Sequence, residues 1–485
     1  MARRPPTDLL LALAYFIVGS IWIASMPELA RLDRDEGFNL MKADLVQRGY
    51  RLYSEIWSDQ PPLFTHLLVA WRTVFGESDP SARMLVLTLT SLGLACAGRL
   101  ATWFAGGRTL AGALTVLLLI GARSYPKLSM AVMIGLPAIS TALAAIVLLR
   151  WSTTLRWGWA IVPFSGGLFA ASMQIKLFTF ILAPMLFATY FVSRRRDGRR
   201  TAIDLALLLS AFAVVSYFAG PFREPGWQQQ LVRTHVKTGL ATDDTQLQAL
   251  RSVLMRFIED APLMLAMAAG LYAGGRAAAR RCLPAVVWII TSVIVLSQAN
   301  PLWGHHRVMF SIPAAMIAGA CLAEVWSRYR AAPRRDWPTR LAFASAGVAF
   351  AYGLAQVTGS IIGLGRGDDT NDPEIVERLR RDRDRIRWVI SDDPHIVHAA
   401  GMVVPPETAV LSLKRLQRDL TEDRFARIID RYQPEVIILA RHAYTPEFVP
   451  RVTRGYGLVI SRKKDRVRMF ERTLPTTTAP SASPG

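Results

Sequence analysis

The sequence contains few cysteines and few charged side chains. Three of its 485 residues are cysteine, and 19% are charged, whereas about 25% are charged in a typical soluble protein. Cys96, Cys282 and Cys321 each lie inside an apolar run, which argues against a disulfide framework. The low charge disfavours an ordinary soluble enzyme, and the 52% of hydrophobic residues excludes a disordered chain.

Motifs for nucleotides and metals are also lacking. No Gly-x-Gly-x-x-Gly or Walker sequence opens a helix in the C-terminal part. No His-x-x-His or Asp-x-Asp cluster has the spacing of metal ligands, and Asp33-Arg34-Asp35 resembles one only superficially. We therefore expect neither a metal nor a cofactor.

Long apolar runs are present instead, and they recur along the chain. A run of about 20 residues is long enough to cross ~30 Å of hydrocarbon. The pattern predicts a polytopic α-helical membrane protein with about eleven transmembrane helices. We place these helices near residues 8–27, 82–104, 108–121, 131–149, 157–173, 176–193, 202–220, 261–275, 282–299, 308–326 and 340–363.

The positive charge predicts the topology. The formal net charge is +20, and arginines such as Arg99, Arg108, Arg150 and Arg281 lie near the ends of apolar runs or in the short gaps between them. Because cytoplasmic loops are rich in Arg and Lys, these gaps indicate a cytoplasmic N-terminus and an extracytoplasmic C-terminus. The charge is thus a topology signal, and we expect membrane lipids rather than nucleic acid as partners. The predicted location is the bacterial inner membrane.

The predicted transmembrane domain, residues 1–363, has two long external loops. The first, residues 28–81, is acidic and contains two amphipathic stretches, Phe38–Arg48 and Leu63–Phe75, that suit helices in the membrane interface. The second, residues 221–260, is polar with scattered aromatic residues.

Residues 364–474 have the composition of a small extracytoplasmic domain. Apolar runs typical of strands alternate with helical patterns such as Glu422–Arg431, which predicts an α/β fold. The runs are Trp388–Ile390, Ala409–Leu413, Val436–Ala440 and Gly457–Ile460. Residues 475–485 are rich in Pro, Ser, Thr and Ala, and we expect them to be disordered.

An ordered set of short motifs follows the first apolar run. It consists of Arg34-Asp35-Glu36-Gly37-Phe38, Gly49-Tyr50-Arg51-Leu52-Tyr53, Asp59-Gln60-Pro61-Pro62-Leu63, Phe75-Gly76 and Ser81-Ala82-Arg83. Gly304-His305-His306-Arg307, Trp388 to Asp393 and Val404-Pro405-Pro406 extend the set. In this set the sequence resembles the GT-C glycosyltransferases that use polyprenyl-phosphate sugars. The similar branch contains the protein O-mannosyltransferases and the lipid A aminoarabinose transferase.

The resemblance implies an inverting glycosyltransferase that takes its sugar from a polyprenyl-phosphate donor. Asp35 is then the candidate general base, which accepts the proton of the acceptor hydroxyl, and Glu36 supports it. An ordinary Asp has a pKa near ~3.9, so Asp35 would take the proton late in the displacement. The expected acceptor is extracytoplasmic: a lipid, a polysaccharide or a protein.

Gln60 departs from the pattern. Related sequences often carry Lys there, facing the lipid phosphate, whereas Gln brings no charge. Cations at the ends of other spans are candidates to replace it: Arg123, Lys127, Lys176, His305, His306 and Arg307. Tyr53, Gln60 and Arg83 complete the predicted donor-binding residues.

Two other classes of function stay open. Transporters and lipid flippases are also polytopic, but they usually contain internal repeats and broken helices, and no repeat is visible here. A noncatalytic membrane scaffold is the third possibility. Loss of glycosyl product in an Asp35→Asn variant separates the transferase from both.

Overall fold

The computed structural model describes most of the chain, and the contacts divide it into two units. The helical unit comprises Met1–Asp33 and Asp59–Asp369, and the α/β unit comprises Arg34–Ser58 and Thr370–Gly485. Part of the first predicted loop therefore groups with the C-terminal residues. The described residues are 7–33, 35–193, 198–233, 243–298, 302–331, 336–365, 372–412, 415, 420–440, 444, 447–462 and 467–473.

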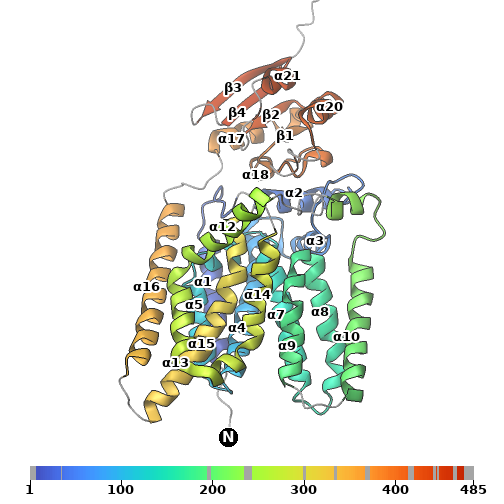
Figure 1. Cartoon of the computed structure of the whole chain (residues 1–485). Coiled ribbons are helices and arrows are strands. Elements are labelled where there is room, and N and C mark those ends of the chain that lie inside the picture. Colours follow the sequence, from blue (N-terminus) through green and yellow to red (C-terminus); the bar gives the residue numbers. More distant parts are fainter. Residues whose placement is uncertain are drawn as a thin grey trace, which may run out of the picture. The chain divides into compact units, whose positions relative to one another are not determined.

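The helical unit consists of long helices that run side by side, joined by shorter ones (Figure 1). Most of these helices carry apolar side chains on all of their faces, as expected for helices that are surrounded by lipid rather than water. In chain order its elements are α1 Thr7–Ala24, α3 Leu63–Phe75, α4 Asp79–Phe104, α5 Thr109–Ile120, α6 Tyr125–Met130, α7 Gly135–Ser152, η1 Gly158–Ala160, α8 Val162–Ile175, η2 Leu177–Leu182, α9 Ala183–Ser193, α10 Gly198–Ala219, η3 Gln228–Arg233, α12 Asp243–Glu259, α13 Ala261–Arg281, α14 Leu283–Leu296, η4 Gly304–Arg307, α15 Val308–Ala331 and α16 Trp337–Gly365.

Helices fill every predicted span, and the polytopic helical fold is confirmed. Within the described residues, six helices are long and apolar enough to cross a membrane, or seven if α13 and α14 form one broken span. These two helices meet at an angle of 96°. Other predicted spans contain shorter apolar helices, such as α5. The count of about eleven crossings stays a prediction.

Helix α15 is the buried centre of the helical unit. Every residue from Val308 to Val325 is buried. A Cβ added at Gly319 would clash with Thr115 Oγ1 on α5, so the two helices approach closely through a small residue. Such contacts are typical of helices packed within lipid. Because the core packs against α15 along most of its length, the charged residues at the two ends of the helix are also held in place.

The second predicted loop, residues 221–260, contains a helix. Helix α12 covers Asp243–Glu259, and Ala249 and Val253 on one of its faces are buried. Apolar residues four positions apart lie on the same face of a helix. The helix ends next to the start of α13, so Arg256, Glu259 and Asp260 lie at the end of the bundle.

The α/β unit contains a four-stranded mixed sheet with the strand order β1-β2-β4-β3 (Figure 1). Strand β1 is parallel to β2, and the other two pairs are antiparallel. Its elements are α2 Glu36–Gln47, α17 Pro373–Arg381, η5 Arg383–Arg385, β1 Val389–Ser391, α18 Pro394–Ala399, η6 Pro406–Thr408, α20 Glu422–Tyr432, β2 Val436–Leu439, α21 Phe448–Val452, β3 Tyr456–Arg462 and β4 Val467–Arg472.

The predicted α/β fold is confirmed, with two differences in its strands. In the predicted run Ala409–Leu413, Ala409, Val410 and Leu411 are buried but belong to no strand, and Leu413 lies outside the described residues. These apolar side chains are therefore part of the core without being paired to a neighbouring strand. Strand β4 was not predicted because Arg468, Glu471 and Arg472 give it a polar sequence. Arg34 and the predicted tail 475–485 lie outside the described residues.

Candidate functional site

Arg307 lies at the start of α15 and is held by two partners in the helical unit. Its Nε donates to Glu259 Oε2 at 3.0 Å, and its Nη2 donates to the same oxygen. Its Nη1 donates to Ser124 Oγ at 2.7 Å. The side chain is 8% exposed. A buried guanidinium needs such partners because an unpaired buried charge is costly.

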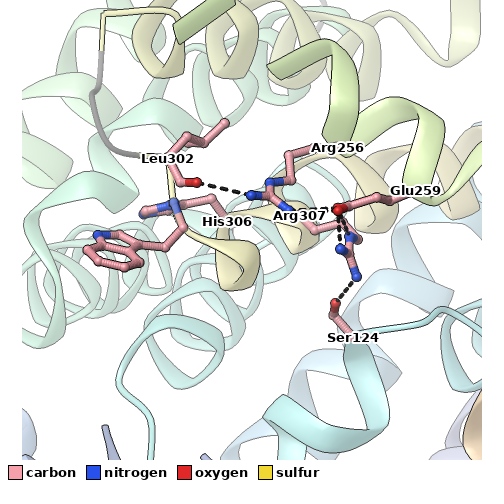
Figure 2. Close-up of polar contacts among 7 residues, drawn as sticks. Ser124, Arg256, Glu259, Leu302, His306 and Arg307 are labelled. Carbon is pink, nitrogen blue, oxygen red and sulfur yellow. Dashed lines mark hydrogen bonds and ion pairs between the residues drawn. The ribbon is translucent and has the colours of Figure 1, made fainter. Parts of the chain in front are cut away.

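Glu259 joins a second arginine to Arg307 (Figure 2). Arg256 Nη1 donates to both carboxylate oxygens at 2.9 and 2.8 Å, and its Nη2 donates to the Leu302 carbonyl at 3.1 Å. Desolvation raises the pKa of the Glu259 carboxyl, but the hydrogen bonds from Arg307 and Arg256 outweigh it and lower the pKa below its ordinary value. Glu259 is therefore an ionised carboxylate between two arginines.

Asp260, the next residue, is a second acid at the same place. It is buried, and the backbone N–H of Arg123 donates to it. Burial raises its pKa to about 6, although Arg307 and Arg123 act in the opposite direction. Asp260 therefore changes charge near pH 6, and this alters the net charge beside Arg307.

Lys176 approaches the same region from the end of α8. Its backbone is extended, with φ −152° and ψ 119°, so the helix ends there. The ammonium lies 4.6 Å from the centre of the Phe178 ring, and that ring contacts the His306 ring edge-on at 5.7 Å. The positive charges of Lys176 and Arg256 both act on His305 and His306.

His306 contributes a neutral donor in this arrangement. The backbone N–H of Trp303 donates to His306 Nδ1 at 3.2 Å. A nitrogen that accepts a hydrogen bond carries no proton, so the proton of the imidazole is on Nε2. The two histidine rings lie 4.5 Å apart.

We call this set of residues the Arg307 cluster. Arg123, Arg256 and Arg307 act on Glu259 and Asp260, so cations outnumber acids among these five residues, which suits an anion such as a phosphate. In the described part of the chain, no group of three or more His, Cys, Asp or Glu residues is placed to hold a metal ion. The members are Arg123, Ser124, Lys176, Arg256, Glu259, Asp260, His305, His306 and Arg307.

The predicted acidic pair belongs to the α/β unit. Asp35 is partly exposed and occupies the position before helix α2, and its side chain makes no cap hydrogen bond to that helix. Glu36 is fully buried in the first turn. Acidic side chains at a helix N-terminus are stabilised by the helix dipole. The partly exposed residue of the pair is thus the one that the sequence predicts as the base.

Tyr53 lies in a tight turn of the same unit. Its φ is 66°, in the left-handed region, and its backbone N–H donates to the Ile56 carbonyl at 2.7 Å. The side chain is buried. A bulky residue in this conformation is strained and persists only where its surroundings hold it.

Gln60 and Arg83 lie in the helical unit. Gln60 precedes α3 and is half-buried. Arg83 on α4 is buried and donates to the Ala30 carbonyl at 2.7 Å, which ties α4 to the turn after α1. Their predicted contacts with a donor stay predictions.

Arg256, Glu259 and Asp260 were not among the predicted site residues. Arg256 and Glu259 are three residues apart on a helix, a spacing that also occurs in ordinary surface ion pairs. The local sequence does not distinguish an ordinary surface ion pair from a pair that belongs to a site. The contact of Glu259 with Arg307, 48 residues away, is what distinguishes this pair.

Comparison with known proteins identifies the fold. No family profile and no curated protein matches the sequence. ArnT from Cupriavidus metallidurans, bound to undecaprenyl phosphate, aligns with a TM-score of 0.63 at 14% identity, over 95% of this chain and 97% of that chain. Its apo state aligns with a TM-score of 0.64 over the same shares, again at 14% identity. The chain has the GT-C fold.

The structure of a second protein supports the GT-C fold. The oligosaccharyltransferase from Archaeoglobus fulgidus, in complex with zinc and sulfate, aligns with a TM-score of 0.51 at 14% identity. The alignment covers 94% of this chain and 71% of that chain. The expected similarity to GT-C membrane enzymes is therefore confirmed at the level of fold.

Proposed function

We propose that this protein is an inverting glycosyltransferase that moves a sugar from a polyprenyl-phosphate donor to an extracytoplasmic acceptor. The Arg307 cluster is the observation that carries this proposal. It is a positively charged group at one end of a GT-C bundle, and a structural neighbour with that fold binds undecaprenyl phosphate.

The cluster is suited to hold the donor phosphate. Glu259 already bridges Arg256 and Arg307 as an anion, and a phosphate oxygen makes the same charge-assisted hydrogen bonds. In our proposal the phosphate takes over these bonds, with Lys176 and the Nε2–H of His306 as further donors. The arginines then stabilise the negative charge that develops as the phosphate leaves.

The transfer step needs a proton acceptor, for which we propose Asp35. The acceptor oxygen forms a bond to C1 of the sugar, and the bond from C1 to the phosphate oxygen breaks. The proton of the hydroxyl goes to Asp35, and the polyprenyl phosphate leaves with the electron pair. Glu36 supports the base. These two roles rest on the sequence resemblance.

We place the reaction at the extracytoplasmic side of a bacterial inner membrane, as the arginine distribution predicts. The sugar stays open, and so does the choice of a lipid, polysaccharide or protein as acceptor. The positions of Tyr53, Gln60 and Arg83 in the motifs support roles in donor binding.

Two measurements on the same variants test the proposal. Binding of undecaprenyl phosphate to purified protein in nanodiscs is measured by native mass spectrometry. Envelope glycans are compared by mass spectrometry in cells that lack the gene and carry wild type or a variant at equal expression. We expect Asp35→Asn to bind the lipid normally but to restore no glycan. Asp33→Asn, two residues earlier, is the matched control and should behave as wild type.

Other outcomes distinguish the remaining classes of function. If Asp35→Asn restores the glycan fully, Asp35 is not the base. If wild type yields no glycan but moves polyprenyl phosphate across a vesicle membrane, the protein is a flippase. If wild type neither binds the lipid nor changes any glycan, the scaffold hypothesis replaces the transferase.

A further inference from the structure

Helix α2, which follows Asp35, packs directly on the C-terminal part of the α/β unit. The contact lies at Gly37, where an added Cβ would be 2.5 Å from the backbone nitrogen of His395 and 2.8 Å from its Cα. His395 belongs to α18, the short helix after β1. Because backbone atoms occupy the space, only glycine allows this approach. Gly37 is one residue from Glu36 and two from Asp35.

A hydrogen bond fixes the other end of the same contact. His398 Nδ1 on α18 donates to Asp44 Oδ2 at 2.5 Å, and both side chains are largely buried. Gly37 and Asp44 are seven residues apart, which is two helical turns, so they lie on the same face of α2. Helix α18 therefore contacts α2 at two points along that face.

A third contact, at Trp57, holds the segment that follows α2. The guanidinium of Arg415 lies 4.5 Å from the centre of the Trp57 ring, and Arg415 Nη1 donates to the Val410 carbonyl at 2.8 Å. Arg415 is buried. A desolvated cation over an aromatic ring contributes more than an exposed one. His395, His398 and Arg415 thus contact the segment 35–58 near its start, in its middle and near its end.

We infer that the C-terminal α/β domain positions the catalytic acid of the first loop, with Gly37, Asp44 and His398 as positioning residues. The inference rests on the proposed function, since it takes Asp35 as the base. Two contacts fix the axis of α2 and the position of its N-terminus, and the third holds the segment that follows the helix. The domain is therefore a part of the catalytic apparatus, and removal of a contact should misplace the acid without altering the phosphate site.

Gly37→Ala is the sharpest test because a methyl group meets backbone that has no room to yield. We expect it to lower glycan formation at least tenfold, while undecaprenyl phosphate binding stays within twofold of wild type. Hydrogen exchange of the full-length protein should rise in peptides from 36–47 and stay unchanged in α15. Gly347→Ala on α16 is the matched control, because nothing lies within 4 Å of its added Cβ.

His398 provides a second test that does not depend on a steric clash. His398→Leu removes the hydrogen bond and should lower glycan formation about threefold to tenfold. His398→Asn keeps a donor near the position of Nδ1 and should restore most of the loss. A merely structural role would not produce a selective loss of transfer with intact lipid binding and rescue by Asn.

Several results would overturn the inference. One is wild-type glycan formation by folded Gly37→Ala and His398→Leu proteins. Another is equal loss of lipid binding and transfer in both variants, since the contacts would then support the whole fold. If wild type forms no glycan, the proposed function itself fails. If hydrogen exchange in peptides from 36–47 is the same in Gly37→Ala as in wild type, α18 does not hold α2.

Discussion

Two glutamates in the helical unit each bind more than one arginine, at opposite ends of α15. Glu259 pairs with Arg256 and Arg307 near the start of the helix. Glu324, near its end, pairs with Arg108, Arg281 and Arg328, and the Arg108 and Arg281 contacts measure 2.8 and 2.7 Å. The two sites contain the same chemical groups, but their burial is reversed.

The difference in burial indicates that the two glutamates have different roles. Glu324 is 11% exposed and its arginines are 36% to 51% exposed, so the acid is the inner group and the cations surround it. At the other end Glu259 is 24% exposed, whereas Arg307 is 8% exposed. A buried acid that ties together three helices has a structural role. An exposed acid beside a buried arginine is one that an incoming anion can replace.

Arg307→Ala is expected to have the largest effect on this comparison. It should weaken undecaprenyl phosphate binding about 10- to 100-fold, because hydrogen bonds to charged groups contribute ~1.5–3 kcal/mol each. Arg307→Lys should fall between wild type and Ala, since Lys lacks the planar fork. Titration of undecaprenyl phosphate into wild type and both variants in nanodiscs measures the three dissociation constants.

Arg281→Ala is the matched variant at the other end of α15. Its dissociation constant should stay within about twofold of wild type, as expected for a partly exposed ion pair away from the ligand. Equal losses from Arg307→Ala and Arg281→Ala would remove the distinction between the two ends.

Neutralising each glutamate should separate the two ends of α15 by lipid binding. Glu259→Gln removes the competing carboxylate and should tighten undecaprenyl phosphate binding about twofold to fivefold, and it should lower the thermal midpoint of the lipid-free protein because the buried Arg307 loses its anionic partner. Glu324→Gln should leave binding unchanged and lower the midpoint, because its arginines lose a charged partner worth ~1–3 kcal/mol. Lipid titration and thermal unfolding of both variants check this. Unchanged lipid binding in Glu259→Gln would mean that Glu259 is only a structural acid.

The smallest effect is expected from Asp260, and it depends on pH. Burial raises the pKa of Asp260 to about 6, so the side chain is neutral at pH 5 and charged at pH 7. The charged form opposes an anion, so wild type should bind undecaprenyl phosphate about twofold to threefold more weakly than Asp260→Asn at pH 7 and equally at pH 5. Taking the ratio of the two constants at each pH cancels the titration of the lipid phosphate itself.

The same shift makes a prediction for stability. An acid whose pKa is raised on folding contributes stability that is fully present below its ordinary pKa of 3.8 and lost as the pH rises through about 6. The thermal midpoint of wild type should therefore fall relative to Asp260→Asn across this range. A difference in thermal midpoint between the two proteins that does not change with pH would contradict the raised pKa of Asp260.

Much of the fold follows from local patterns. The hydropathy of each run predicts its helix, and Leu63–Phe75 is a helix with the predicted bounds. Strands β1, β2 and β3 follow from their apolar residues, whereas β4 does not because its charges hide it. Lys176, His305 and Arg307 were selected as cations at span ends, and the structure brings them together. Polar residues at span ends were informative because charge is costly in lipid.

The sequence by itself determined which segments are helices, because hydropathy and helical periodicity act over neighbouring residues. Only the tertiary structure decided that Glu259 meets Arg307 and that Asp44 meets His398, 354 residues away. An ion pair or a hydrogen bond depends on which side chains packing brings within about 3 Å, and no local pattern specifies a partner so distant in the chain. For the same reason, the association of residues 34–58 with the C-terminal domain became evident only in the folded protein.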